Sequence, residues 1–339
     1  MSQFEPTFAD VETVSSRFDN SIAPASQASA TTEPFVCASP GLADFPGGTA
    51  VVISTRGRPN IVNALVRQLA DQTLPPEHIF IVATCTDDIA ELDQKQDGLT
   101  VTIGRPGSTF QRNDGLKLAG ARFSHIVFFD DDFVPSRFWI ERMTAIFDAR
   151  PDVAGITGDV LADGTRTVGI DRADALKMVE LKDKTAPYSR FLDDSFAFGS
   201  NVGCNMAYRY SKMHDITFDE NLPLYAWHED SDFRGQVTQR GQFVRADALW
   251  GVHLGHKTGR GSGLTLGYSQ IANAFYLARK GTVPARFLAE IAVKNIIINT
   301  LRSLRPEPFV DRRGRMRGNF IALADFLRGR LAPDRILKL

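Results

Sequence analysis

Three consecutive carboxylates, Asp130, Asp131 and Asp132, directly follow an apolar run that begins at His125. An apolar run of this length is typical of a strand buried on both faces within an α/β sheet. The carboxyl ends of such strands are where open α/β sheets bind their ligands. Because side chains alternate along an extended chain, we expect Asp130 and Asp132 to point the same way and Asp131 to point elsewhere.

Two carboxylates that converge at the end of a buried strand repel each other unless a cation lies beside them. Asp130 and Asp132 therefore indicate a site for a divalent cation held by oxygen ligands. Two other interpretations stay open at this point. The acids could form a solvated turn, or they could cap a helix that follows Ser136.

A second acidic pair, Glu229 and Asp230, lies about 100 residues further along the chain. Phe233 and Val237 have the four-residue spacing of a helix face, and Gly241 indicates where that helix has ended. The two acids then occupy the first helical turn. The helix dipole favours negative charge there whatever its function, so position alone does not assign a role.

A late segment, residues 252–263, combines histidines and cations with four glycines. Such a loop suits closure over a diphosphate, and it is equally typical of a mobile surface loop. Its candidate side chains are His253, His256, Lys257 and Arg260.

The elements that position these residues predict an α/β fold whose first half is of Rossmann type. Apolar runs predict strands at 49–55, 78–83, 99–103, 125–129, 153–160 and 243–248. Helical spacing predicts helices at 61–69, with Asn60 as its cap, and at 113–122. Residues 163–195 are polar and irregular, and we expect a loop over the site. The small residues at 199–203 suit either close approach to a sugar or a tight turn.

The turn after the first strand reads Thr55-Arg56-Gly57-Arg58-Pro59 and lacks a glycine-rich dinucleotide fingerprint. The GxxxxGK[ST] pattern is also missing. A Rossmann-type half with acids after its fourth strand and neither signature points away from NAD enzymes and P-loop NTPases. It favours a nucleotide-sugar site.

The composition is that of an ordinary globular protein, with 339 residues, 43% hydrophobic residues and a formal net charge of -1. This balance gives no reason to expect nucleic-acid binding. Three widely spaced cysteines predict neither a disulfide framework nor a zinc cluster, and with no apparent secretory signal we expect a cytoplasmic protein. We interpret residues 1–46 as a mobile tail, 47–264 as the catalytic domain and 265–339 as a helical extension.

The last segment is basic, with 14 Lys or Arg against 5 Asp or Glu from Arg279 to Leu339. Phe287, Ile291, Ile298 and Leu301 share a helical face, so residues 280–339 could contact the anionic inner face of the cell membrane. The alternative is a helical subdomain packed on the catalytic core, with solvated cations. A role of this segment in homo-oligomers also stays open.

Six short motifs, in order, resemble those of family 2 glycosyltransferases with the GT-A fold, over roughly residues 48–260. They are VVISTRGRP, FFDDDFVP, GCNMAYR, FDENL, WHEDSDF and VHLGH. The resemblance implies one continuous mixed sheet with a nucleotide-binding half and an acceptor half. It also implies an inverting transferase that uses Mn or Mg.

By this resemblance Asp132 contacts the metal, Asp130 lies near the ribose or the metal, and Asp230 is the catalytic base, with Glu229 beside it. Either His253 or His256 contacts the metal or the diphosphate. The remaining candidates for contacts with the nucleotide sugar are Thr55, Arg56, Arg58, Thr84, Asp87, Arg112, Asp131, Lys257 and Arg260. Of the three consecutive acids, we expect Asp131 to tolerate substitution best.

The resemblance departs from the family where an acid that binds the nucleobase often follows the second strand. That place reads Ala83-Thr84-Cys85-Thr86-Asp87 here, so Asp87 or Thr84 would have to serve. We expect transfer from a nucleoside diphosphate sugar, UDP favoured, to a saccharide or lipid-linked saccharide, in surface polysaccharide or glycoconjugate synthesis. The alternatives are a sugar nucleotidyltransferase and a non-catalytic nucleotide-sugar binding module.

Overall fold

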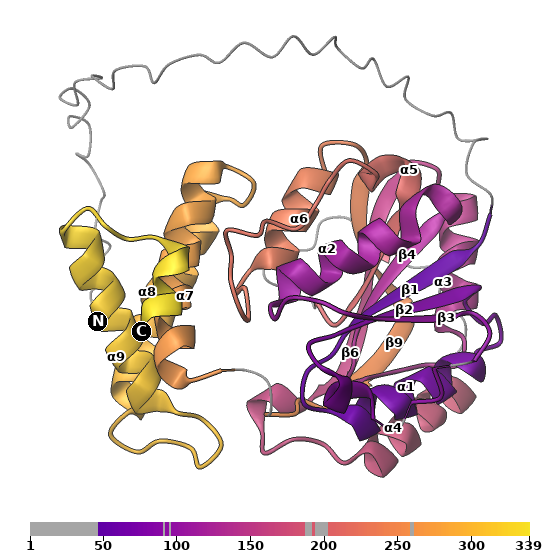
Figure 1. The fold of residues 1–339 in the computed structure, drawn as a ribbon, viewed down its shortest axis with the longest axis horizontal. Coiled ribbons are helices and arrows are strands. Elements are labelled where there is room, and N and C mark those ends of the chain that lie inside the picture. The colour runs from indigo at the N-terminus through magenta and orange to yellow at the C-terminus, as the bar shows by residue number, and fades with distance from the viewer. Residues whose placement is uncertain (1–46, 91, 95, 187–191, 194–202, 258–260) are drawn as a thin grey trace, which may run out of the picture. The chain divides into compact units, whose positions relative to one another are not determined.

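The computed structural model describes residues 47–90, 92–94, 96–186, 192–193, 203–257 and 261–339 (Figure 1). Within them, nine strands form one mixed sheet in the order β3-β2-β1-β4-β8-β6-β9-β5, with β7 paired to β9. The strands are β1 (Thr49–Ser54), β2 (His78–Ala83), β3 (Leu99–Ile103), β4 (His125–Asp130), β5 (Phe133–Pro135), β6 (Val153–Asp163), β7 (Leu192–Asp193), β8 (Asn205–Arg209) and β9 (Gln242–His253).

Helices cover both faces of this sheet and continue beyond it towards the C-terminus (Figure 1). The α-helices are α1 (Pro59–Ala70), α2 (Ser108–Ala119), α3 (Trp139–Ala149), α4 (Arg172–Thr185), α5 (Tyr210–Met213), α6 (Glu229–Val237), α7 (Gly263–Lys280), α8 (Ala285–Arg302) and α9 (Arg312–Leu327). The 3-10 turns are η1 (Thr86–Ile89), η2 (Gly120–Arg122), η3 (Gly164–Arg166) and η4 (Pro333–Lys338).

The alternation of β1 explains why the sheet is covered on both sides. Val51 and Ile53 belong to the core beneath α1 and α3, whereas Ala50 and Val52 belong to the core beneath α2, α5 and α6. All four side chains are at most 1% exposed, as expected for a strand inside an α/β sheet.

Strand register brings the ends of distant segments to one place. β1 and β4 run parallel with Ser54 opposite Asp130, so the two carboxyl ends coincide. β9 pairs with β5 through His253 opposite Phe133, and with β6 through His253 opposite Asp163. The acidic turn after β4 and the end of β9 therefore lie together.

The structure confirms the expected α/β architecture, a continuous mixed sheet followed by C-terminal helices. It corrects four local predictions. Arg58 rather than Asn60 precedes the first helical residue, which is Pro59. The helix expected at 113–122 already begins at Ser108. The expected loop at 163–195 contains α4. β9 runs on to His253, so this histidine ends a strand. Residues 1–46 and 199–202 lie outside the described part.

The C-terminal helices are held together by close backbone contact and by a buried amide network. A Cβ on Gly267 of α7 would overlap the Arg315 carbonyl, and one on Gly318 of α9 would overlap that of Leu264. Asn299 Nδ2 donates to Gln270 Oε1 at 2.9 Å and to Asn319 Oδ1 at 3.0 Å. Asn319 Nδ2 donates to the Gly267 carbonyl at 2.7 Å. Among the described helices, none has the length and apolar character to cross a bilayer.

His125, the first residue of β4, gives a prediction about pH and stability. It is 5% exposed and stacks on Phe147 at a centroid distance of 4.7 Å. Burial, assisted by the charge of Arg209, lowers the pKa of His125 to about 4. An unfolded histidine titrates near pH ~6.5, so the unfolded chain takes up this proton first as the pH falls.

The stabilisation by neutral His125 is therefore complete above pH ~6.5 and is lost as the pH falls towards 4. From this residue we expect the free energy of unfolding to fall by about 2 kcal/mol between pH ~7 and ~5 in urea denaturation. In His125→Asn the fall should be smaller by that amount. An equal fall in both proteins would contradict the prediction.

Candidate active site

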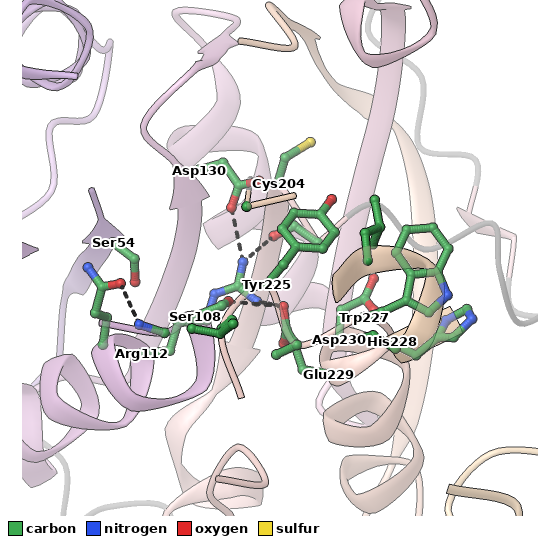
Figure 2. Close-up of a pocket in the computed structure, with 18 of the residues that line it drawn as sticks. Ser54, Ser108, Arg112, Asp130, Cys204, Tyr225, Trp227, His228, Glu229 and Asp230 are labelled. Carbon is green, nitrogen blue, oxygen red and sulfur yellow. Dashed lines mark hydrogen bonds and ion pairs between the residues drawn. The ribbon is translucent and has the colours of Figure 1, made fainter. Parts of the chain in front are cut away.

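A cavity of about 420 Å³ opens where the carboxyl ends of β1 and β4 face the first turn of α6 (Figure 2). Its volume lies within the usual range for small-molecule sites. The residues around it come from both halves of the sheet and from the C-terminal helices. Those that bear on the chemistry are Thr55, Arg58, Arg112, Asp130, Asp230 and His253.

Asp130, Asp132 and His253 each offer one ligand atom, and these three atoms lie within 4.8 Å of one another. His253 Nε2 lies 3.2 Å from Asp132 Oδ1, and both side chains are buried. Burial alone would raise the pKa of Asp132, but hydrogen bonding and charge from His253 hold it below its usual range. Burial would likewise lower the pKa of His253, yet Asp132 and Asp163 raise it to about 10. The two carboxylates are suitable donors for Mn²⁺ or Mg²⁺, and the imidazole would add its Nε2 once a bound cation displaces the proton there.

Asp131 makes a separate set of contacts beneath the turn. It is fully buried, accepts from Thr55 Oγ1 at 2.7 Å and lies 3.1 Å from Arg58 Nη2. Burial raises the pKa of Asp131 to about 7, and the Arg58 charge opposes this rise. These contacts speak against the expectation that Asp131 tolerates substitution best, because a neutral or larger side chain would deprive the buried Thr55 hydroxyl of its acceptor and remove one of the two carboxylates beside Arg58.

Arg112 of α2 connects the acidic turn to α6 (Figure 2). Its Nη2 lies 3.0 Å from Asp130 Oδ1 and donates to the Gly203 carbonyl at 3.0 Å, while Nη1 forms an ion pair with Glu229. Burial would lower the pKa of Arg112, but the charges of Glu229 and Asp130 raise it instead. Burial raises the pKa of Glu229 to about 8, with Arg112 opposing. Glu229 is thus engaged in holding Arg112.

Asp230 lines the cavity one residue further along, in the first turn of α6 as the sequence predicted. Its Oδ1 accepts from the Ser231 backbone N–H at 2.8 Å. Gly203 lies against it, since a Cβ there would approach Asp230 Oδ2 to 3.3 Å. Of the three acids in this turn, Asp232 does not line the cavity and Glu229 is paired with Arg112, which makes Asp230 the candidate to receive a proton from a ligand there.

The turn after β2 differs from the expectation. Thr84 and Asp87 are not among the described residues that line the cavity. The buried acid there is Asp88, which accepts from the Gly57 backbone N–H at 2.5 Å and from Thr84 Oγ1 at 2.7 Å. Asp88 fixes the Gly57 turn, where φ is +68°. The backbone N–H groups of Thr84 and Cys85 also donate to Asp88. These four hydrogen bonds outweigh the effect of burial and lower the pKa of Asp88.

The late basic segment contributes less to the cavity than expected. His256 donates its backbone N–H to Asp132 Oδ2 at 2.8 Å, whereas His253 provides the imidazole beside Asp132. Lys257 Nζ donates to the carbonyls of Gly164 and Thr165, at 2.9 and 3.0 Å, rather than towards the cavity. Arg56 is exposed and lines the cavity. Arg260 lies outside the described residues.

The sequence interpretation missed Asp163 at the end of β6. Its Oδ1 lies 3.1 Å from His253 Nδ1, so this imidazole lies between two carboxylates. The available signal in the sequence was that Asp163 follows the apolar run that begins at Val153. The pairing of β6 with β9 contains register shifts that the sequence does not reveal. The interpretation also missed the aromatic residues Tyr225, Trp227 and His228 as part of the cavity lining; Tyr225 lies beside Cys204, and Trp227 and His228 lie together beyond Asp230 (Figure 2).

Comparison with solved structures gives similar chains of low sequence identity. The 1–349 fragment of S. aureus TarS is 15% identical, with 85% of this chain and 82% of that chain covered and a TM-score of 0.49. The same fragment in complex with UDP-GlcNAc is 16% identical, with 85% of this chain and 82% of that chain covered and a TM-score of 0.49. The mannosyltransferase PcManGT from Pyrobaculum calidifontis, in complex with GDP-Man and Mn2+, is 14% identical. The comparison covers 86% of this chain and 89% of that chain, with a TM-score of 0.47.

No curated protein matches the sequence. A family model does match, the one described as Glycosyltransferase like family 2, over residues 46–223. The matched segment contains β1 to β8, and with them the acidic turn and Arg112. Because this model spans more than half of the 339 residues, the chain belongs to the family 2 glycosyltransferases.

Proposed function

We propose that this glycosyltransferase moves a sugar from a nucleoside diphosphate sugar to a saccharide hydroxyl, with inversion and with a divalent cation. The observation that carries the proposal is a single cavity lined by Asp130 and His253 at one side and by Asp230 at another. Arg112 links the two sides through Asp130 and Glu229. A nucleotidyltransferase or a binding module would not require a carboxylate in the position of Asp230.

Asp230 is the proposed general base. A sugar hydroxyl is a weak nucleophile at neutral pH, so a positioned carboxylate that takes its proton assists attack. The acceptor oxygen forms a bond to the anomeric carbon while the bond from that carbon to the diphosphate oxygen breaks. The proton moves to Asp230, and the nucleoside diphosphate leaves with the electron pair.

Asp130, Asp132 and His253 would hold the cation, Mn²⁺ or Mg²⁺, which supplies charge neutralisation for the leaving diphosphate. Thr55, Arg56 and Arg58 line the cavity on the side of β1 and suit the nucleotide. Uracil is the base that we favour, so a UDP-sugar is the expected donor. Parallel hydrolysis assays with UDP-, GDP- and dTDP-sugars test that choice.

The acceptor is proposed to lie against Tyr225 and Trp227. These rings are 6.2 Å apart at 29°, and Tyr225 is 42% exposed. Aromatic faces of this kind can pack against the C–H groups of a sugar ring. Among the described residues Trp227 Nε1 has no hydrogen-bond partner although it is buried, so a sugar hydroxyl could accept from it. A saccharide or lipid-linked saccharide used in surface polysaccharide or glycoconjugate synthesis fits this site.

Peripheral contact with an anionic membrane is a further part of the proposal. The exposed apolar stripe of α8 consists of Val293, Ile297 and Leu301, which are 55%, 51% and 65% exposed. The face expected from the sequence is corrected here, because Phe287, Ile291 and Ile298 are only partly exposed. Lys294 and Arg302 flank the stripe and are exposed; Arg302 is paired with Glu307, so Lys294 provides the positive charge beside the apolar groups.

The role of Asp230 gives the first test. Asp230→Asn should lower kcat for transfer by at least about 100-fold, because general-base assistance is worth roughly that much. Affinity for the nucleotide with Mn²⁺, measured by calorimetry, should stay within about twofold. Asp215→Asn, an exposed carboxylate outside the cavity, is the control. Transfer by Asp230→Asn at a near wild-type rate would remove the assignment.

The acceptor site gives the second test. Trp227→Phe keeps an aromatic ring and removes the indole N–H, so the KM for acceptor should rise by about fivefold, the value of one hydrogen bond. The KM for the donor, measured by hydrolysis without acceptor, should be the same in Trp227→Phe as in the wild-type protein. If the acceptor KM does not change, the acceptor does not bind Trp227.

Membrane contact gives the third test, in flotation with vesicles containing phosphatidylglycerol. Ile297→Asp with Leu301→Asp should abolish flotation, since it places two carboxylates in the exposed stripe. Leu181→Asp, at 64% exposure on α4, is the matched control and should float normally. Unchanged flotation of the double variant would contradict the proposal. The proposal would also be contradicted if the wild-type protein did not float and the double variant lost self-association instead.

A further inference from the structure

Helix α7 makes polar contacts with the segment that carries Asp230. Asp232 lies in the same first turn of α6, two residues after Asp230, and is fully buried. Lys280 Nζ lies 2.8 Å from Asp232 Oδ2, and Thr282 Oγ1 donates to Asp232 Oδ1 at 2.5 Å. Lys280 is the last residue of α7, and Thr282 is in the turn after it. A buried carboxylate requires such partners to remain charged.

We propose that Lys280 and Thr282 are positioning residues for catalysis, which hold α6 through Asp232 so that Asp230 faces the acceptor hydroxyl. The end of α7 and the turn after it are then part of the positioning of the catalytic base. This inference rests on the proposed role of Asp230 as the base. It concerns side chains outside the family match at residues 46–223.

The same lysine holds a second point of the chain. Lys280 Nζ lies 2.6 Å from Asp219 Oδ2, which also accepts from Tyr276 OH of α7 at 2.8 Å. Asn273 Nδ2 of α7 donates to the Trp227 carbonyl at 3.0 Å. One face of α7 thus binds residues before, within and after the turn that leads into α6.

The backbone also brings α6 against the end of α7. Gly235 lies on α6 where a Cβ would overlap the Thr282 carbonyl. Any side chain at this position would push the two segments apart and lengthen the contact between Thr282 and Asp232. The glycine therefore permits the close approach on which the contact depends.

The turn that leads into α6 is strained and requires support from outside. Leu224, Ala226 and His228 have φ values of +59°, +48° and +71°, in the left-handed region that side chains disfavour. Such residues persist only where their surroundings determine the conformation. Leu222 and Ala226 pack against Ala274 and Leu277 of α7, which provides that support together with Asn273.

Positioning at this level has a kinetic value. A shift of about 1 Å in a catalytic group can lower a rate roughly 100-fold even when the substrate still binds. Loss of the Lys280 contacts leaves the buried Asp232 carboxylate with Thr282 and Gln236 as its side-chain donors. The first turn of α6 would then move to bring Asp232 towards water, and Asp230 would move with it.

The experiment compares Lys280→Met, Lys280→Arg and Asn319→Ala in the full-length chain. Lys280→Met should lower kcat for transfer by about 10-fold or more and leave donor affinity within about twofold. Lys280→Arg keeps the charge and should restore most of kcat. Asn319→Ala removes a buried amide of the α7–α9 network, far along the chain from α6, and should lower the melting temperature while kcat stays within about twofold.

Hydrogen exchange provides a second measurement that does not depend on the chemistry of Asp230. Lys280→Met should increase amide exchange at residues 229–233, and Asn319→Ala should not. Equal losses of kcat in Lys280→Met and Asn319→Ala would reduce Lys280 to a stabilising residue and overturn the inference. Unchanged exchange at 229–233 in Lys280→Met would also overturn it. If Asp230→Asn alone retains activity while Lys280→Met opens α6, the base assignment fails and the mechanical link stands.

Discussion

The buried guanidinium of Arg112 is the interaction on which the site depends. Asp130 closes the nucleotide-binding half, Glu229 begins the helix of the other half, and Arg112 lies between them at 5% exposure. Without it the buried Glu229 carboxylate would lack a cationic partner, and it would repel the partly exposed Asp130 carboxylate. Because Arg112 also binds the Gly203 carbonyl, it fixes the segment before β8 against the acidic turn. One charge thereby links the acidic turn after β4 to the first turn of α6, which carries the proposed base Asp230.

Positively charged or imidazole side chains also contact the other two acids of the acidic turn. His253 contacts Asp132 and Asp163, while Arg58 contacts Asp131 and Asp132. The acidic turn is thus surrounded by cationic or imidazole groups. This arrangement holds the pKa of buried Asp132 below its usual range, so that its carboxylate stays charged, as a divalent cation requires of its ligands. His253 is well suited to adapt, because its Nδ1 is oriented by Asp163 while Nε2 faces Asp132.

Much of the fold could be predicted from the sequence because its signals are local. The apolar runs at β1, β2 and β4 and the first turn of α6 are read from neighbouring residues alone. The errors arose where distant segments meet. Asp131 looked dispensable because its partners, Thr55 and Arg58, lie more than 70 residues away in the sequence. Asp163 and the true end of β9 depend on strand pairing with register shifts, which periodicity cannot report.

The Gly267 and Gly318 contact has a consequence for how such enzymes can be recombined. The backbones of α7 and α9 touch through these glycines, and α7 in turn contacts the strained approach to α6. A crossover placed between residues 264 and 265 would join one parent's α7 to another parent's α6 and separate surfaces that fit each other. The interchangeable unit instead begins before Asp219 and continues through α9. Residues 219–327 therefore form one packing unit, and a chimera that exchanges them together keeps the contacts among α6, α7 and α9 intact.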